Sequence, residues 1–289
     1  MSEQMPVLKT PQWKIRLETA IKQMGAVERR VAEYILEDPK RIISKSITEV
    51  AEEAGASEAT IVRFCRHIGC VGFQDLKISV AQEVVPLIDV MYSGISPEDS
   101  IGTIKSKVFY NSIRSMQDSQ VLLDDEQLEK AVKLLANAKQ IDIVGMGSSG
   151  IVAEDAQHKF LKIGLNVNVF RDTHLQMLSI SRMQEGDVVI GISFTGGSRD
   201  VIDALEYAQA HKIHTIGITS QPKSPLTKAS DIKLFSTGHD SMLISDNVVS
   251  RMATLALIDT LYVAIGLQMG DKALNNLEKG RESQVIKGF

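Results

Sequence analysis

From Ile141 onward the sequence alternates between short apolar runs and stretches of helical period, and this alternation restricts the fold more than any other feature. The apolar runs are IDIVGMG, VNVF, DVVIGISF, HTIGITS and DIKLFS. Continuous apolar runs that are bounded by turns and separated by helices are typical of a parallel sheet covered on both faces. We therefore expect an α/β fold of the flavodoxin-like, doubly wound kind, with a five-stranded parallel sheet.

Residues 13–85 follow a different pattern, because their apolar residues recur at helical spacing throughout. This spacing predicts an all-α N-terminal domain over 13–85. Gly, Pro and Ser gather in residues 86–100, which predicts a linker there. The α/β domain then occupies residues 101–289. We expect it to begin with helices over 101–140 and to include a long apolar helix over 247–267, which should pack against the sheet or another subunit.

Composition argues against membrane, secreted and metal-binding classes. No apolar run approaches the roughly 20 residues of a membrane helix, and the N-terminus lacks the apolar core of a secretory signal. We therefore expect a cytoplasmic protein with no membrane partner. Cys65 and Cys70 are too few for a disulfide framework or a complete zinc site, and we interpret them as small buried hydrophobic residues. We expect no metal and no cofactor.

Residues 46–72 read SITEVAEEAGASEATIVRFCRHIGCVG and predict a helix-turn-helix motif. A short amphipathic helix ends at Gly55, which can adopt the left-handed conformation of a tight turn. Ser57 is placed to cap a second helix. Its inward face would carry Ile61, Phe64, Cys65 and Ile68. Its outward face would carry Ala59, Thr60, Arg63 and Arg66, which with Ser57 are our candidate DNA contacts. An ordinary helix pair in a bundle fits the same pattern.

The charge balance does not by itself indicate DNA binding. Residues 1–83 hold 12 Lys and Arg and 12 Asp and Glu, and the whole chain has a net charge of −4. A DNA-binding domain therefore needs its positive charge gathered on one face. The acidic residues Glu52, Glu53 and Glu58 must then point away from the duplex.

Two Gly/Ser loops follow predicted strands and are candidates for anion binding. The first is GMGSSG, with Ser148 and Ser149 at a helix N-terminus. The second is SFTGGS, with hydroxyls around its two glycines. Its candidate residues are Ser193, Thr195, Gly196 and Ser198. Each loop alone fits a plain helix cap, but both lie at strand carboxyl ends, where such folds bind ligands. The spacing of GMGSSG matches neither a dinucleotide fingerprint nor a Walker loop.

The N-terminal motifs resemble the DNA-binding domain of the RpiR family of bacterial regulators. The matching residues are ERRVAEYIL with the following Pro39, GASEATIVRFCRHIG, and GFQDLK. They cover most of residues 15–80. In that family this domain binds DNA, so the resemblance implies that Ser57, Thr60 and Arg63 lie at the family's recognition positions. It also suggests that Lys77, in GFQDLK, adds a phosphate contact.

The two Gly/Ser loops together resemble the SIS (sugar isomerase) fold over residues 125–265. The resemblance implies that Ser193, Thr195 and Ser198 hold a phosphate and that Ser148 and Ser149 contact the sugar or the phosphate. DAQHKFLKIG and DTHLQ resemble the MurR-like members, which respond to amino-sugar phosphates such as N-acetylmuramic acid 6-phosphate. His174 is then placed to reach a sugar hydroxyl, oriented by Asp172, or to cap a backbone carbonyl. Arg199 is placed to pair with phosphate or to point to solvent.

We therefore expect a DNA-binding transcription regulator, a repressor, whose operator binding is controlled by a sugar phosphate. A palindromic double-stranded operator and a homodimer or homotetramer follow from the short reading helix. The alternative is a sugar-phosphate isomerase or etherase, which needs a general base. The candidate bases are Glu154, His158, His174 and His239. None forms an obvious pair with another titratable group, so we expect no enzyme and assign no catalytic residue. A structural protein would leave both anion loops unexplained.

Overall fold

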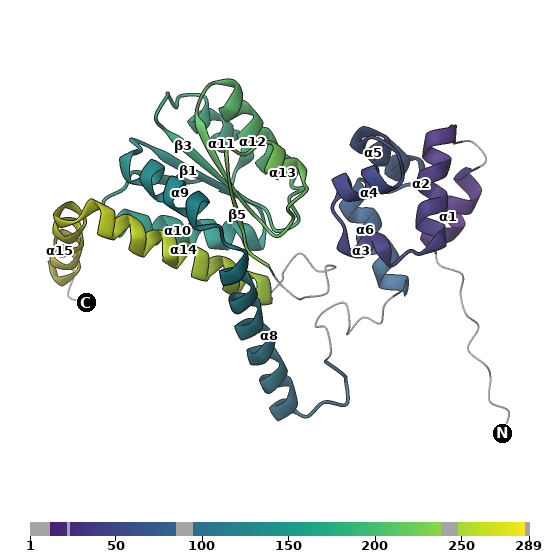
Figure 1. Cartoon of the computed structure of the whole chain (residues 1–289), viewed down its shortest axis with the longest axis horizontal. Coiled ribbons are helices and arrows are strands. Elements are labelled where there is room, and N and C mark those ends of the chain that lie inside the picture. The colour runs from purple at the N-terminus through teal and green to yellow at the C-terminus, as the bar shows by residue number, and fades with distance from the viewer. Residues whose placement is uncertain (1–11, 22–23, 85–94, 238–247, 287–289) are drawn as a thin grey trace. The chain divides into compact units, whose positions relative to one another are not determined.

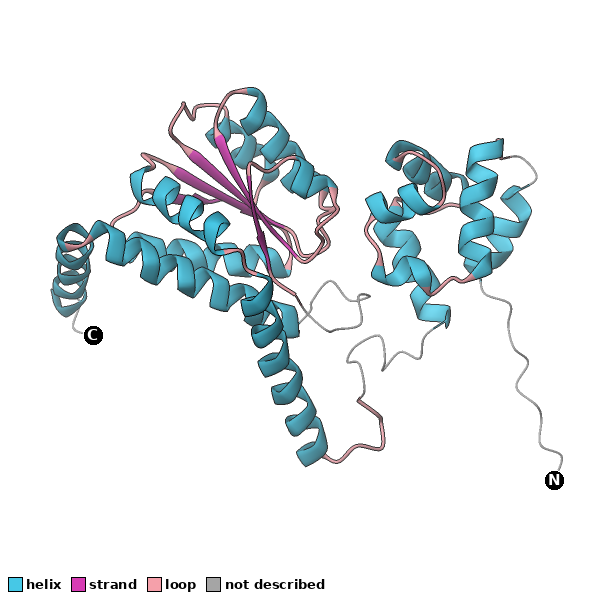
Figure 2. Cartoon of the chain, viewed as in Figure 1, coloured by secondary structure: helices cyan, strands magenta, loops and turns pink. Residues whose placement is uncertain are grey.

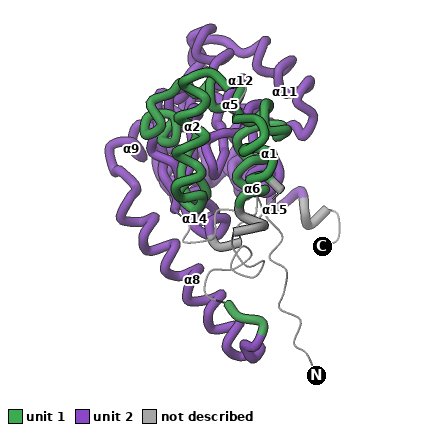
Figure 3. Tube along the Cα trace, turned by 90° about the vertical axis from the view of Figure 1, so that its right-hand side faces the viewer, with its two compact units in different colours: residues 1–97, 241–244 green, residues 98–240, 245–289 purple. Residues whose placement is uncertain are grey.

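The computed structural model describes residues 12–21, 24–84, 95–237 and 248–286 (Figure 1). These residues form two compact units (Figure 3). The described residues up to Pro97 belong to the first unit and those from Glu98 onward to the second. Of the predicted linker, residues 86–94 lie outside the described residues.

The first unit is built from helices around one apolar core. The helices are α1 (Gln12–Ala20), α2 (Ala26–Glu37), α3 (Arg41–Ser44), α4 (Ile47–Glu53), α5 (Glu58–His67) and α6 (Phe73–Val84). Fully buried side chains from α1, α2, α5 and α6 meet in the core, among them Leu17, Ile35, Phe64 and Leu76. The all-α architecture expected for this region is confirmed.

Local capping explains where α4 and α5 begin. Ser46 caps α4 in a reciprocal box: its hydroxyl accepts from the Glu49 amide, and the Glu49 carboxylate accepts from the Ser46 amide. Ser57 caps α5 by accepting from the amide of Thr60 at 3.2 Å. Between the two helices Gly55 has φ +61°, the left-handed conformation that glycine adopts without strain. The helix-turn-helix geometry is therefore encoded within a few residues of the turn.

The second unit begins with α8 (Ile101–Leu122) and α9 (Asp125–Asn137) and then alternates strands with helices. The strands are β1 (Ile141–Gly145), β2 (Val167–Val169), β3 (Val188–Ile192), β4 (His214–Thr219) and β5 (Ile232–Phe235). The helices after β1 are α10 (Ser148–Lys162), α11 (Thr173–Ile180), α12 (Arg199–Ala210), α13 (Pro225–Lys228), α14 (Val248–Met269) and α15 (Asp271–Ile286).

The strands form one sheet, drawn in magenta in Figure 2. All neighbouring strands are parallel, and their order is β2-β1-β3-β4-β5. This is the flavodoxin-like order, and the expected five-stranded parallel sheet is confirmed. Alternate residues of β1 and β3 enter separate cores. In β1, Ile143 faces the core formed with α9, α10 and α14, whereas Val144 faces the core formed with α11, α12 and α13. Figure 1 shows the two helix layers on opposite sides of the sheet.

The helix α14 corrects one expectation from sequence. Residues Ser250–Met269 are long and apolar enough to cross a membrane by length and composition alone, with a mean hydropathy of 1.5. The apolar stretch is therefore longer than we expected. In the structure this helix packs against α8, α9 and α10, and Leu257, Ile258, Leu261 and Ile265 are buried in the core of the second unit. The apolar composition of α14 is therefore explained by its packing in the core of the second unit.

Candidate functional site

The exposed face of α5 carries the basic residues of the helix-turn-helix. Arg63, Arg66 and His67 are exposed on this face, and Ala59 lies one turn before Arg63. The opposite face holds Ile61, Phe64, Cys65 and Ile68 in the core, as their spacing predicts. The helix therefore directs two guanidinium groups and an imidazole outward. Ser57 is exposed at its N-terminus.

Arg63 and His67 are both held by one buried carboxylate, that of Glu28 on α2. The Arg63 Nε lies 2.6 Å from Glu28 Oε1, and the His67 Nδ1 lies 3.1 Å from Glu28 Oε2. Burial by itself raises the pKa of Glu28, but the hydrogen bond from Arg63 and the positive charges of His67 and Arg63 outweigh it and hold that pKa below its usual value. Neither Glu28 nor His67 was among the residues predicted from sequence, because a contact across 35 residues leaves no local spacing signal.

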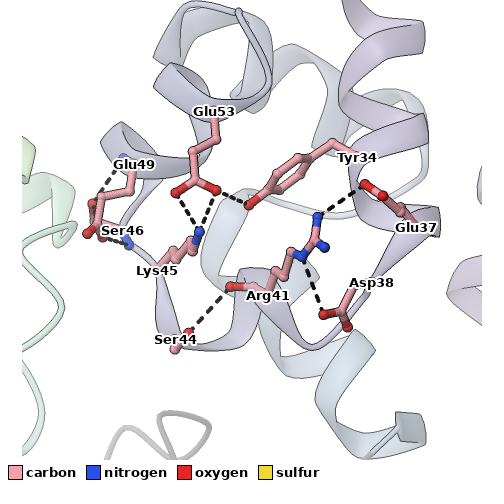
Figure 4. Close-up of polar contacts among 9 residues, drawn as sticks. All are labelled: Tyr34, Glu37, Asp38, Arg41, Ser44, Lys45, Ser46, Glu49 and Glu53. Carbon is pink, nitrogen blue, oxygen red and sulfur yellow. Dashed lines mark hydrogen bonds and ion pairs between the residues drawn. The ribbon is translucent and has the colours of Figure 1, made fainter.

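The acidic residues near the motif have partners within the same unit. The Glu53 carboxylate accepts hydrogen bonds from Lys45 and, at 2.6 Å, from the Tyr34 hydroxyl (Figure 4). The hydrogen bond from Lys45 lowers the pKa of Glu53. Glu58 accepts from the Thr48 hydroxyl at 2.7 Å. Figure 4 also shows Arg41 between Glu37 and Asp38. The charges of Glu53, Glu37 and Asp38 are therefore compensated by cations of the same unit, whereas Glu58 accepts a hydrogen bond from a neutral hydroxyl.

Two predicted DNA contacts lie elsewhere than expected. Lys77 is only 3% exposed, and its Nζ donates to the Lys45 carbonyl at 2.9 Å. Burial lowers the pKa of Lys77 to about 8. Its ammonium links α6 to the turn before α4 and is buried, which contradicts the expected phosphate contact. Thr60 is also buried rather than outward-facing, and its hydroxyl lies 2.8 Å from that of Ser57.

The two Gly/Ser loops lie side by side at one end of the sheet. Ser148 and Ser149 open α10 directly after β1, and the loop 193–198 follows β3. β1 and β3 are neighbouring strands, and the chain continues from them toward opposite edges of the sheet. It runs from β1 to β2 at one edge and from β3 to β4 toward the other. This is the switch point of a doubly wound fold, where the crevice outside the strand ends binds ligands.

The loop 193–198 is compact and held by its own hydroxyl groups. The Ser193 hydroxyl donates to the Ser198 hydroxyl at 2.9 Å, and the Thr195 hydroxyl accepts from the Gly197 amide at 3.4 Å. Gly196 has φ +63°, and a Cβ there would lie 2.3 Å from the Ser224 hydroxyl oxygen. The position therefore requires glycine on both conformational and steric grounds. The loop ends where α12 begins, so its hydroxyls lie beside the N-terminus of that helix.

A pocket opens between the first loop and the N-terminal part of α14. Its polar lining includes Ser148, Ser149, Thr219, Ser236, Arg251 and Thr254, and Phe194 of the second loop forms part of its wall. The Ser236 and Thr254 hydroxyls lie 2.9 Å apart. None of the described lining residues is acidic, and Arg251 forms no ion pair with any residue that the structure describes. Among the described residues, the pocket therefore offers hydroxyl groups and one guanidinium group.

Thr219, Ser236, Arg251 and Thr254 were missed by reasoning from sequence. The available signal was the polar segment SRMAT at the start of an otherwise apolar helix. Only the tertiary structure places that segment beside Ser148 and Ser149.

Other predicted effector residues do not line this pocket. His174 is exposed near the start of α11, and Asp172 caps that helix by accepting from the Leu175 amide at 2.9 Å. Asp172 thus has a capping role where we expected it to orient His174. Arg199 forms an exposed ion pair of 2.7 Å with Asp203. Of the loop 193–198, Phe194 is in the described pocket lining. The predicted phosphate residues of this loop are not in that lining: Ser193, Thr195 and Ser198.

The candidate general bases lie away from the pocket. Glu154 is paired with Arg171 through two contacts of 2.6 and 2.9 Å, and the hydrogen bond from Arg171 lowers its pKa. His158 is exposed on α10. His239 lies outside the described residues. Among the described lining residues there is no Asp, Glu or His.

Comparisons with known proteins agree with this division into two units. Residues 12–86 match the family described as "Helix-turn-helix domain, rpiR family", and residues 134–264 match the SIS domain. An HTH-type transcriptional regulator of Caldanaerobacter subterraneus is 36% identical over 255 residues, which are 88% of this chain and 90% of that protein. The HTH-type transcriptional regulator HexR of Pseudomonas aeruginosa is 32% identical over 93% of this chain and 94% of its own.

Among solved structures, the Vibrio vulnificus NanR protein complexed with ManNAc-6P is similar along nearly the whole chain. Its TM-score is 0.78 at 27% identity, covering 94% of this chain and 98% of that one. The similarity therefore includes both units.

Proposed function

The chain belongs to the rpiR family of helix-turn-helix transcriptional regulators with a SIS domain, and on that premise we propose that a sugar phosphate in the second unit controls operator binding by the first. The protein is a repressor in the cytoplasm, and its effector releases it from DNA. The regulator class rests on the family. The effector, the operator and the direction of control are the proposal.

The outward face of α5 supports DNA recognition by the first unit. Arg63 and Arg66 project from a helix whose opposite face is buried, which is the arrangement of a recognition helix in the major groove. Arginine can contact guanine or phosphate through its terminal amino groups. The carboxylates of Glu53 and Glu58 accept hydrogen bonds from side chains of the same unit. These contacts hold the two carboxylates within the unit and reduce their electrostatic repulsion of the DNA phosphates.

The observation that carries the effector proposal is the guanidinium of Arg251 in a pocket whose described lining is otherwise hydroxyl-bearing and apolar. A positive charge among several hydroxyls, without a carboxylate, suits an anionic and polyhydroxylated ligand. The loop 193–198 adds further hydroxyls and a helix N-terminus, which favour phosphate. The NanR structure supports the same ligand class, because that relative is complexed with ManNAc-6P. An amino-sugar phosphate is therefore our proposed effector.

The same pocket argues against the isomerase or etherase alternative. Aldose–ketose isomerisation requires a general base near the substrate carbon. The described lining supplies hydroxyls and a guanidinium instead, and the relatives reported above are named as regulators. We therefore propose a binding role without turnover.

A dimer or tetramer supports operator recognition by so short a helix. One such helix gives too little contact for useful specificity, so regulators of this kind pair two across a palindrome. On α8 the large side chains of Phe109, Tyr110 and Ile113 are exposed, and on α14 those of Val263 and Leu267. Exposed apolar side chains on two long helices suit contact with a second copy.

The decisive experiment measures operator affinity with and without effector. A thermal-shift screen over hexose and amino-sugar phosphates first finds the effector, since ligand at 100 times its Kd stabilises by about 2.7 kcal/mol. Operator affinity is then compared in wild type and in Ser193→Ala with Ser198→Ala. We expect the effector to weaken wild-type binding about 5- to 150-fold, and the double variant to bind DNA but ignore the effector. Tighter binding with effector would reverse the direction of control, and no effect would refute the sensor.

A further inference from the structure

Glu28 is a buried acidic residue directly behind the exposed face of α5. Its side chain is 5% exposed, whereas that of Arg63, which it contacts, is 63% exposed. The same carboxylate also contacts His67, one turn further along α5. One carboxylate on α2 therefore touches two of the outward-facing residues of the helix-turn-helix.

The contact to Glu28 uses the part of Arg63 nearest its own backbone. Nε is the atom that lies 2.6 Å from Glu28 Oε1. The terminal amino groups form no hydrogen bond or ion pair with any residue that the structure describes. A planar guanidinium that is held at Nε keeps its outer donors in a fixed direction. Those outer donors are the ones that pair with guanine O6 and N7.

A buried carboxylate restrains its partner more strongly than a surface ion pair does. Leaving such a charge without a counter-charge is costly, so Arg63 is kept at Glu28 in the protein free of DNA. The long arginine side chain then loses less rotamer freedom when DNA binds. Part of the conformational entropy of the Arg63 side chain is therefore lost during folding and not on DNA binding.

We propose that Glu28 is a positioning residue for DNA recognition, which aims the terminal amino groups of Arg63 at base edges. This inference rests on the proposed function, because it needs α5 to read DNA. It does not require Glu28 to touch DNA. His67 is the second restraint on the carboxylate and keeps its other oxygen occupied.

Positioning and simple electrostatics predict opposite effects of Glu28→Gln. Removing a negative charge near the recognition helix should strengthen DNA binding if only the field matters. If Glu28 positions Arg63, the same change should weaken specific binding although the net charge becomes more favourable. Glu33→Gln is the matched control, because Glu33 is an exposed residue of the same helix and the change removes the same charge.

The probes are a duplex selected by the full-length wild-type protein from a random library and a scrambled duplex of the same length. We expect Glu28→Gln to lower affinity for the selected duplex at least tenfold and to leave or raise affinity for the scrambled one. Glu33→Gln should not weaken either. In an Arg63→Ala background, Glu28→Gln should have little further effect, because the group that it positions is gone.

Thermal unfolding of each variant separates folding from recognition. If Glu28→Gln does not fold, Arg63→Lys provides the test with the carboxylate intact. Lysine keeps the charge but cannot contact Glu28 and a base pair together, so it should lose preference for the selected duplex.

Unchanged or tighter binding of the selected duplex by folded Glu28→Gln would overturn the proposal. An undiminished preference of Arg63→Lys for the selected duplex over the scrambled one would do the same. A further loss from Glu28→Gln in the Arg63→Ala background would also overturn it. If the wild-type protein selects no duplex at all, it is the proposed function that fails, before Glu28 is tested.

Discussion

The hydroxyl of Ser119 on α8 accepts a hydrogen bond of 2.8 Å from the backbone amide of Thr237, just after β5. Ser115, one turn earlier, donates to the carbonyl of the same residue, and both serines are buried. The preceding residue, Ser236, lines the pocket beside Ser148 and Ser149. The pocket wall and α8 are therefore joined through adjacent residues, and α8 is the first helix of the second unit.

Replacing Ser119 with alanine should loosen this junction. The partly buried Thr237 amide loses its acceptor, which should lower the free energy of unfolding by about 1 kcal/mol. If α8 transmits the effector signal, the variant should also show a smaller change in operator affinity on adding effector. Ser106→Ala is the control, because among the described residues the Ser106 hydroxyl bonds within α8, to the Gly102 carbonyl. Denaturant unfolding and operator titration provide both readouts. Equal stability of the two variants would contradict the structural role assigned to Ser119.

Arg251 should determine effector binding without affecting DNA binding. Arg251→Gln removes the only charged group among the described residues lining the pocket, so effector affinity should fall at least tenfold. Calorimetric titration measures it, with the effector identified by thermal shift. Operator affinity without effector should stay at the wild-type value. Arg182→Gln, an exposed position just after α11, is the control for net charge and should bind effector normally. Undiminished effector affinity in Arg251→Gln would remove this residue from the site.

Lys77 should make stability depend on alkaline pH. Burial lowers its pKa to about 8 in the folded protein, whereas an unfolded lysine titrates near about 10.4. Between these values the unfolded state binds more protons, so stability rises with pH in that window. The free energy of unfolding of wild type minus that of Lys77→Met should therefore increase from about pH 8 to about pH 10.4. Denaturant unfolding at several pH values checks this. A flat difference would mean that the ammonium is not desolvated.

Lys77→Met should also leave DNA binding unchanged. The ammonium of Lys77 contacts the Lys45 carbonyl inside the first unit, so no phosphate contact is lost. The slope of operator affinity against salt concentration should match that of wild type, because this slope counts phosphate contacts. A slope lower by about one would show that Lys77 reaches the duplex after all.

The assembly state should be a dimer or a tetramer. The exposed fractions of Phe109 and Tyr110 on α8 are 66% and 63%, so two adjacent aromatic side chains leave apolar area that a second copy would cover. Sedimentation at micromolar concentration should give a multiple of the 31.7 kDa chain mass. Phe109→Glu should shift the equilibrium toward monomer if α8 forms the contact. A wild-type protein that sediments only as monomer would refute the expected assembly.

Local features of the sequence predicted most of the architecture. The helix-turn-helix follows from the cap at Ser57 and the turn at Gly55, both of which act within a few residues. The five strands follow from apolar runs bounded by turns, because a strand buried on both faces admits few polar residues. The two Gly/Ser loops were located for the same reason, since glycine and hydroxyl residues between strand and helix leave a local signature.

The sequence by itself determined which segments are helices and strands, whereas the tertiary structure decided which side chains meet. Arg63 contacts Glu28 across 35 residues, and Arg251 lines one pocket with Ser148 although the two belong to different helices. The family resemblance suggested a phosphate contact for Lys77, yet α6 turns its ammonium inward onto the Lys45 carbonyl. Capping and periodicity act over a few residues of chain, but charge compensation and burial depend on which distant segments pack together. The chemistry of both candidate sites therefore depends on packing that no local pattern encodes.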